Sequence, residues 1–205
     1  MLNRYARAIV TRVFSPLARV LLRAGVSPDA VTVVGTVGVC AGALTLYPRG
    51  ELFVGTLVIT AFVFCDNVDG VMARISGRTS PWGAFLDSLM DRFGDAAIFA
   101  GLAMWFAGRA DHPRMAAAAV VCLTIGGIVS YARARAESAG YAASVGIAER
   151  AERLVVVLVV AGLTGLLDLP LVILEVVLWL LALASLITII QRAVAVYRQV
   201  QAAAP

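Results

Sequence analysis

A cluster of carboxylates interrupts a sequence that is otherwise apolar. It consists of five aspartates: Asp66, Asp69, Asp87, Asp91 and Asp95. Carboxylates crowded into a poorly solvated site repel one another and take up protons unless a cation neutralises them. Because oxygen ligands suit hard divalent ions, the cluster predicts a site for Mg²⁺ or Mn²⁺. Acids of this kind could hold two ions about 3.5 to 4 Å apart, as in enzymes that displace phosphoryl groups.

The spacing of the acids places them on two helix faces. At about 100° per residue, the first face collects two acids, two small residues and a cation. These are Asp66, Asp69, Gly70, Ala73 and Arg74. On the following helix, Gly83, Asp87 and Asp91 succeed one another at i, i+4 spacing. The small residues would let a phosphorylated ligand approach the backbone, whereas the alternative is a hairpin in which the acids only pair with nearby arginines.

The composition indicates a membrane protein. The 205-residue chain is 61% hydrophobic, its mean hydropathy is +0.91, and only 15% of its residues are charged. Soluble domains are about 45 to 50% apolar, and here the charges cluster between long uncharged runs, as loops do between spans. This topology explains the net charge of +4, so we expect no nucleic-acid partner.

Six apolar runs predict an all-α fold with six transmembrane helices. The runs are 30–47, 52–65, 96–108, 115–131, 154–167 and 169–190. The second and third runs are shorter than the roughly 20 residues that cross a bilayer. We therefore expect the second helix to continue through the first two acids to about Ile75, and the third to begin near Pro81. Ser27 and Ser80, each followed by a proline, are predicted helix caps.

The arginines give the expected orientation. With six spans, thirteen arginines lie on one side and three on the other, so the positive-inside rule puts the acids and both termini in the cytoplasm. All 17 basic residues are arginine, which is typical of GC-rich bacteria, and we expect the bacterial inner (plasma) membrane.

The chain is expected to have two parts. Residues 1–26 are predicted to form an N-terminal interfacial amphipathic helix in contact with membrane lipids, and residues 27–205 the six-helix domain. The apolar face of the first part is made of Leu2, Tyr5, Ile9 and Val13.

The acids belong to a longer pattern, DxxDGxxAR from Asp66 to Arg74, followed after eight residues by GxxxDxxxD from Gly83 to Asp91. With this pattern the chain resembles the CDP-alcohol phosphotransferase family over nearly its whole length. The resemblance implies transfer of a phosphatidyl or similar group from a CDP-linked donor, CDP-diacylglycerol, to an alcohol, with release of CMP. It also implies a homodimer.

The resemblance assigns roles to the residues of the pattern. The metal ligands, for two ions, would be Asp66, Asp69, Asp87 and Asp91. Asp91 would also be the base that takes the hydroxyl proton of the acceptor. The nucleotide site would be formed by Gly70, Ala73, Arg74 and Gly83 together with Asp66, Asp69 and Asp87. Asp95 lies outside the pattern, and we expect it to be a supporting or structural acid.

A second polar cluster predicts the acceptor. Its members come from the expected cytoplasmic ends of the last three helices: Ser130, Arg133, Arg135, Arg150, Arg153 and Arg192. Guanidinium groups bind phosphate in bidentate fashion, so these side chains could enclose an acceptor phosphate, although positive-inside bias alone also brings arginines here.

Three segments make the expected acceptor more specific. SYARARAE, IAERAERL and LDSLMDR resemble the phosphatidylinositol phosphate synthases of actinobacteria and archaea, which implies inositol phosphate as the acceptor. The alternative within the family is a phosphatidylglycerophosphate synthase that uses glycerol 3-phosphate. From another class, a cation-coupled transporter would need a second acidic cluster in the C-terminal half, which the sequence lacks.

Overall fold

The structure is a computed structural model that describes residues 2–77 and 80–203; the side chains of residues 2–12, 66 and 67 are outside the described set. The described residues form α-helices and one short 3-10 helix, without a strand. In chain order these are α1 (Leu2–Arg23), α2 (Pro28–Leu46), η1 (Tyr47–Arg49), α3 (Leu52–Val63), α4 (Cys65–Ser76), α5 (Pro81–Ala107), α6 (Pro113–Ser138), α7 (Arg150–Leu167) and α8 (Leu171–Ala203). The all-α prediction is confirmed.

Two helix starts follow the predicted capping pattern. The Ser27 hydroxyl accepts a hydrogen bond from the amide of Ala30 at 3.2 Å, and the Ser80 hydroxyl accepts one from Gly83 at 3.0 Å. In both cases a proline occupies the first helical position, where its missing N–H costs nothing. The caps fix the starts of α2 and α5.

The second predicted helix is interrupted. It was expected to run unbroken to about Ile75, but α3 ends at Val63 and α4 begins at Cys65. Phe64 lies between them, and its amide still bonds to the carbonyl oxygen of Thr60 at 3.1 Å. The break is therefore local, and it lies two residues before the first acid of the pattern.

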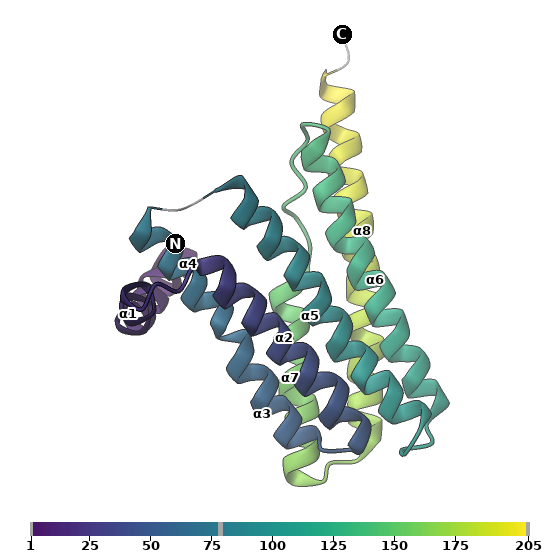
Figure 1. Cartoon of the computed structure of the whole chain (residues 1–205). Coiled ribbons are helices and arrows are strands. Elements are labelled where there is room, and N and C mark those ends of the chain that lie inside the picture. The colour runs from purple at the N-terminus through teal and green to yellow at the C-terminus, as the bar shows by residue number, and fades with distance from the viewer. Residues whose placement is uncertain (1, 78–79, 204–205) are drawn as a thin grey trace.

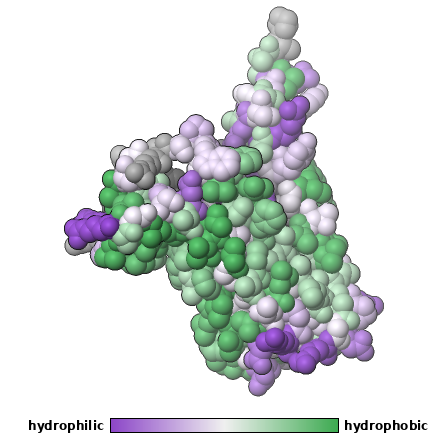
Figure 2. Space-filling model, viewed as in Figure 1, coloured by the Kyte–Doolittle hydropathy of each residue, from purple (hydrophilic) through white to green (hydrophobic). Residues whose placement is uncertain are grey.

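Four helical stretches in the described part of the chain are long and apolar enough to cross a membrane: Pro28–Arg49, Leu52–Ser76, Pro113–Ser138 and Leu171–Ala203. Helices α5 and α7 also belong to the bundle, but each carries site charges, such as Asp91 and Arg153, near one end. Large apolar side chains are exposed along the outside of the bundle, and Figure 2 shows them as a broad band above a polar end. Such a surface fits contact with lipid.

The core runs through the bundle, with buried residues from α2, α3, α5, α6, α7 and α8. Tyr47, Leu102, Phe106 and Leu178 are fully buried in it. Figure 1 shows α6 and α8 side by side, extending beyond the rest of the bundle toward the C-terminus, while the N-terminal half of α5 diverges from α6. The packed lower part of the bundle thus holds the two diverging helices in place.

Helix α1 packs against α4 and is seen nearly end-on in Figure 1, so its axis crosses those of the bundle. Ala18 of α1 is buried with Val71 and Met72 of α4, whereas Val13 and Leu17 are exposed. Of the predicted apolar face, the side chains of Leu2, Tyr5 and Ile9 lie outside the described residues. The interfacial role of this helix stays a prediction.

Candidate active site

The predicted metal ligands come from α4 and α5, and α2 packs against both helices. Asp69 is buried, Asp91 is partly buried and Asp87 is exposed. Asp66 lies in α4, but its side chain is outside the described residues. Among the described side chains, no three acidic, histidine or cysteine groups are arranged to hold a metal ion. The described side chains therefore supply carboxylates from two helices, but they do not by themselves form a complete set of metal ligands.

Asp69 is held by the first turn of α2. Its carboxylate accepts a hydrogen bond from the Thr32 hydroxyl, which also lies 3.2 Å from the carbonyl oxygen of Pro28. Both side chains are buried. Because the hydroxyl has one proton and the carboxylate is the nearer, charged acceptor, Thr32 donates to Asp69 and orients its carboxylate.

The starts of α2 and α5 lie close together. A Cβ atom at Gly83 would stand 3.7 Å from Oδ1 of Asp29 and 3.4 Å from the Ser80 hydroxyl. On α4, a Cβ atom at Gly70 would stand 3.4 Å from Nη1 of Arg74. Because glycine has no side chain, the helix backbone stays accessible at these two positions, which agrees with the predicted close approach of a ligand.

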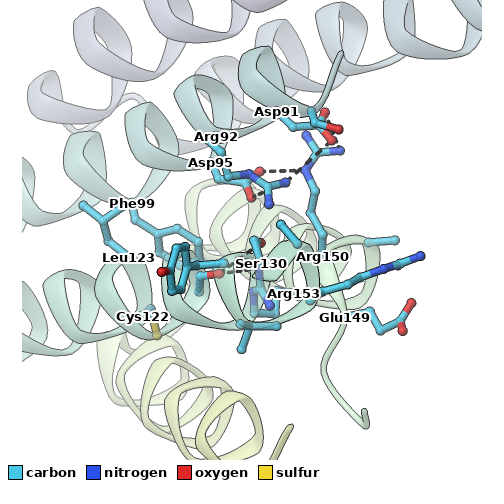
Figure 3. Close-up of a pocket in the computed structure, with 18 of the residues that line it drawn as sticks. Asp91, Arg92, Asp95, Phe99, Cys122, Leu123, Ser130, Glu149, Arg150 and Arg153 are labelled. Carbon is cyan, nitrogen blue, oxygen red and sulfur yellow. Dashed lines mark hydrogen bonds and ion pairs between the residues drawn. The ribbon is translucent and has the colours of Figure 1, made fainter. Parts of the chain in front are cut away.

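Four charged groups form an ion-pair network between α5 and α7 (Figure 3). Nη1 of Arg150 is 2.9 Å from Oδ1 of Asp91, and its Nε donates to Oδ1 of Asp95 at 3.0 Å. Arg92 stands further off, with Nη2 at 3.6 Å from Asp91 and 3.7 Å from Asp95. Two of the acids that the sequence analysis identified are thus neutralised by cations of the chain itself.

A cavity of about 920 Å³ adjoins this network, between α5, α6, α7 and the end of α8. It brings together most of the predicted acceptor-binding residues: Ser130, Arg133, Arg150, Arg153 and Arg192. Asp91, Asp95, Glu137 and Glu149 line it as well. Arg135 does not line it; this side chain is exposed and donates to the Ser138 hydroxyl at 3.3 Å.

The two deepest arginines of the cavity are fixed by backbone carbonyl groups. Arg153 donates to Ala148 at 3.1 Å and to Gly126 at 3.4 Å. Arg153 is only 3% exposed, and no carboxylate lies within ion-pair distance of it among the described residues. A buried cation without an anionic partner is costly, so this end of the cavity favours an anion.

Arg192 is equally buried but differs in its partners. It donates to Val145 at 2.9 Å and to Val129 at 2.6 Å, and its Nη2 is 3.6 Å from Glu149. Its guanidinium therefore connects α8 to α6 and to the segment before α7. Arg133, nearer the surface, is paired with Glu137 at 2.8 Å.

Several contacts of the site were absent from the sequence analysis. Nothing in the sequence indicated the bond of Thr32 to Asp69 or the contact of Glu149 with Arg192. The pairs of Arg92 with Asp91 and Asp95 agree with the alternative in which the acids pair with nearby arginines. Asp95 was left outside the pattern, although it bonds to Arg150. The signal available for Asp95 was its i, i+4 spacing from Asp91, which continues the acidic face by one turn.

Comparison with known proteins gives consistent results. Residues 25–203 match the CDP-alcohol phosphatidyltransferase family. The chain is 56% identical over 204 residues to the phosphatidylinositol phosphate synthase of Streptomyces avermitilis, covering 97% of this chain and 84% of that protein. It is 46% identical over 191 residues to the phosphatidylinositol phosphate synthase of Mycolicibacterium smegmatis, covering 93% and 86%.

Solved structures agree. The Mycobacterium tuberculosis phosphatidylinositol phosphate synthase with CDP-DAG bound superimposes with a TM-score of 0.83 at 45% identity, over 91% of this chain and 94% of that one. The same enzyme in complex with manganese and citrate gives a TM-score of 0.85 at 45% identity, over 90% and 88%.

Proposed function

Because the chain belongs to the CDP-alcohol phosphatidyltransferase family, we propose that it transfers the phosphatidyl group of CDP-diacylglycerol to inositol phosphate, giving phosphatidylinositol phosphate and CMP. The observation that carries this assignment is the 56% identity over 97% of the chain to an enzyme named phosphatidylinositol phosphate synthase. The solved relative with CDP-DAG bound supports the donor.

The donor set fits a hard divalent cation. It consists of carboxylate oxygens from Asp66, Asp69, Asp87 and Asp91, the ligand type that Mg²⁺ and Mn²⁺ prefer. Asp91 also pairs with Arg150 at 2.9 Å, so a bound metal ion would share this acid with a cation of the chain. Two ions bound here would offset the charge of the diphosphate and of the leaving CMP.

Asp91 is proposed as the general base. It would take the proton of the acceptor hydroxyl, and the hydroxyl oxygen would then attack the phosphorus that carries the diacylglycerol. The bond from that phosphorus to the oxygen bridging it to CMP breaks, and CMP leaves with the bridging oxygen. For Asp91 to act as the base, its ion pair with Arg150 must weaken, because a nearby cation stabilises the carboxylate and makes it a weaker base.

The acceptor phosphate is proposed to bind in the arginine-lined cavity. Arg153 supplies a buried charge without a carboxylate partner among the described residues, so an incoming phosphate would compensate it. Arg133, Arg150 and Arg192 line the same cavity, and Ser130 adds a hydroxyl that bonds to Gly126 at 3.2 Å. Arg135 lies outside the cavity, so its contribution is expected to be small.

The membrane arrangement follows from the same assignment. We propose six spans, in which α5 and α7 cross the bilayer with their charged ends at the cytoplasmic face of a bacterial plasma membrane. CDP-diacylglycerol would then meet the acids at the height of the lipid headgroups. A homodimer is part of the proposal and is tested by the mass of the purified protein.

The acceptor is tested with purified protein, CDP-diacylglycerol and Mg²⁺. CMP release is compared for inositol phosphate, glycerol 3-phosphate, free inositol and serine at equal concentrations. We expect turnover with inositol phosphate and its loss on chelation of the metal. Equal turnover with glycerol 3-phosphate would overturn the acceptor assignment and leave the reaction class intact.

A further inference from the structure

Arg150 is shared between two carboxylates of α5. Its Nη1 is 2.9 Å from Asp91 and its Nε is 3.0 Å from Asp95. Both acids are largely buried, with side chains 18% and 15% exposed. Arg92 contacts the same two acids only at 3.6 and 3.7 Å, so Arg150 makes the tighter pair with each. Charge-assisted bonds at such distances are the strong ones in proteins.

The segment just before Arg150 is bonded to α8. Arg150 is the first residue of α7 and follows a segment bonded to α8. The Ala148 amide donates to the Thr188 hydroxyl at 3.0 Å, and Arg192 donates to the Val145 carbonyl oxygen at 2.9 Å. The position of the Arg150 guanidinium therefore depends chiefly on its own side-chain partners.

The guanidinium lies at a boundary. On one side is Asp91, the last acid of the proposed metal set, and on the other is the cavity, which Arg150, Asp91 and Asp95 all line (Figure 3). When Asp91 binds a divalent cation, its charge is shared with that ion, and the ion repels Arg150. Asp95 is one helical turn further along α5, so its carboxylate remains available to Arg150.

We propose that Asp95 is a positioning residue: it keeps the Arg150 guanidinium at the cavity wall once Asp91 is engaged by metal, so that Arg150 can contact the acceptor phosphate. This inference rests on the proposed function. It assigns Asp95 neither to the metal nor to the reacting atoms. Asp95 acts through Arg150, and loss of its charge should weaken acceptor binding and leave metal binding in place.

The test compares Asp95→Asn, Asp95→Glu and wild type in the full chain with Mn²⁺ and CDP-diacylglycerol. In Asp95→Asn the KM for inositol phosphate should rise roughly 10-fold while kcat changes less, the result expected for one weakened charge-assisted bond. Asp95→Glu keeps the charge and should restore most of the loss. Mn²⁺ affinity, followed by electron paramagnetic resonance without substrates, should stay within about 3-fold of wild type, well below the change that follows loss of a metal-site partner.

The matched control is Asp111→Asn. Asp111 lies in the segment between α5 and α6, outside the cavity, and has a φ of 50° that asparagine tolerates. The same chemical change there should leave KM and kcat as in wild type. An equal effect in both variants would overturn the inference.

A double-mutant cycle with Arg150→Gln tests the proposed route. If Asp95 acts through Arg150, Asp95→Asn should raise the acceptor KM in wild type and add little in the Arg150→Gln background. Additive effects, or a large loss of Mn²⁺ affinity in Asp95→Asn, would overturn the inference. Should Asp95→Asn fail to fold, Arg150→Lys is tested in its place. Lysine keeps the positive charge but cannot bond to two carboxylates at once as the planar guanidinium does. An unchanged acceptor KM in this variant would equally contradict the proposal.

Failure of the proposed function has a different signature. Wild type would then release CMP with another acceptor, or not at all. The inference about Asp95 fails by itself where wild type uses inositol phosphate but one of the contradicting results above is obtained.

Discussion

Arg192 of α8 donates a hydrogen bond from Nη1 to the carbonyl oxygen of Val129 in α6 at 2.6 Å. A second bond from its Nε to Val145 fixes the segment that leads into α7. One buried side chain thus connects α8, α6 and the segment before α7. Arg192 therefore has a structural function in addition to any contact with a phosphate.

Replacing Arg192 by alanine should lower both stability and acceptor affinity. The change leaves the buried carbonyl group of Val129 and the more exposed one of Val145 without their donor, a loss of about 1 to 3 kcal/mol. We expect the Tm of the detergent-purified protein to fall by several degrees and the KM for inositol phosphate to rise. Arg135→Ala is the matched control, because Arg135 is exposed on α6 and outside the cavity. An unchanged Tm would refute the structural function, and an unchanged acceptor KM would remove Arg192 from the phosphate site.

Thr32→Val should weaken metal binding, although Thr32 is not one of the proposed metal ligands. The substitution keeps the shape of the side chain but removes the hydroxyl that orients the Asp69 carboxylate. Loss of such a partner reduces metal affinity by about 10- to 100-fold, which a Mn²⁺ titration followed by electron paramagnetic resonance would detect. Thr45→Val on the same helix is the control, since the Thr45 hydroxyl bonds only to the Ala41 carbonyl oxygen among the described residues. Equal Mn²⁺ affinity in the two variants would contradict the assigned contact.

Arg153→Met should remove the buried cation of the cavity while it keeps a side chain of similar volume. Methionine fills a similar volume without charge, and replacement of a buried ion by an apolar group is often tolerated. We expect the Tm to fall by several degrees relative to Arg135→Met, because the carbonyl groups of Ala148 and Gly126 lose their donor. Acceptor affinity of the folded protein should fall by roughly 10- to 100-fold, because the buried cation of the proposed phosphate site is gone. Calorimetric titration with inositol phosphate measures the affinity; wild-type affinity in Arg153→Met would argue against a phosphate at this end of the cavity.

Gly101→Ala should disturb the packing of α5 on α2. A Cβ atom there would stand 2.3 Å from the carbonyl oxygen of Ala43, a backbone atom that cannot move aside alone. We expect a loss of stability of about 1 to 3 kcal/mol or more, as for other overpacked cores. Gly94→Ala on the same helix is the control, because its Cβ would meet only Val39 at an ordinary 3.5 Å. Similar Tm values for both variants would contradict the described contact between the helices.

The elements of the fold that local sequence patterns control were predictable. The two Ser-Pro pairs predicted the caps at Ser27 and Ser80, and both accept the expected bonds. Helix α5 begins at Pro81, as expected from its cap. The break at Phe64 was missed, because the apolar run and the acidic face are each consistent with helix and nothing in their periodicity marks the joint.

The site was predictable only in part, for a related reason. The i, i+4 rule brings Asp87 and Asp91 onto one face from local geometry alone. The contacts of Thr32 with Asp69 and of Arg150 with Asp95 join residues 37 and 55 positions apart, so they depend on how whole helices pack. If this end of the bundle is cytoplasmic, as predicted, positive-inside bias alone would also bring arginines here. Only the cavity distinguishes Arg153, which lines it, from Arg135, which does not.

The central claim is that the aspartates of α4 and α5 hold divalent cations that bind and activate the CDP-linked donor. The most direct measurement is CMP release as a function of Mg²⁺ or Mn²⁺ concentration, in wild type and in Asp91→Asn, with CDP-diacylglycerol and inositol phosphate saturating. We predict no release without metal, restoration by either ion, and a rate about 10²- to 10⁴-fold lower in Asp91→Asn, as expected when a general base is lost. Metal-independent release, or a wild-type rate in Asp91→Asn, would contradict the account.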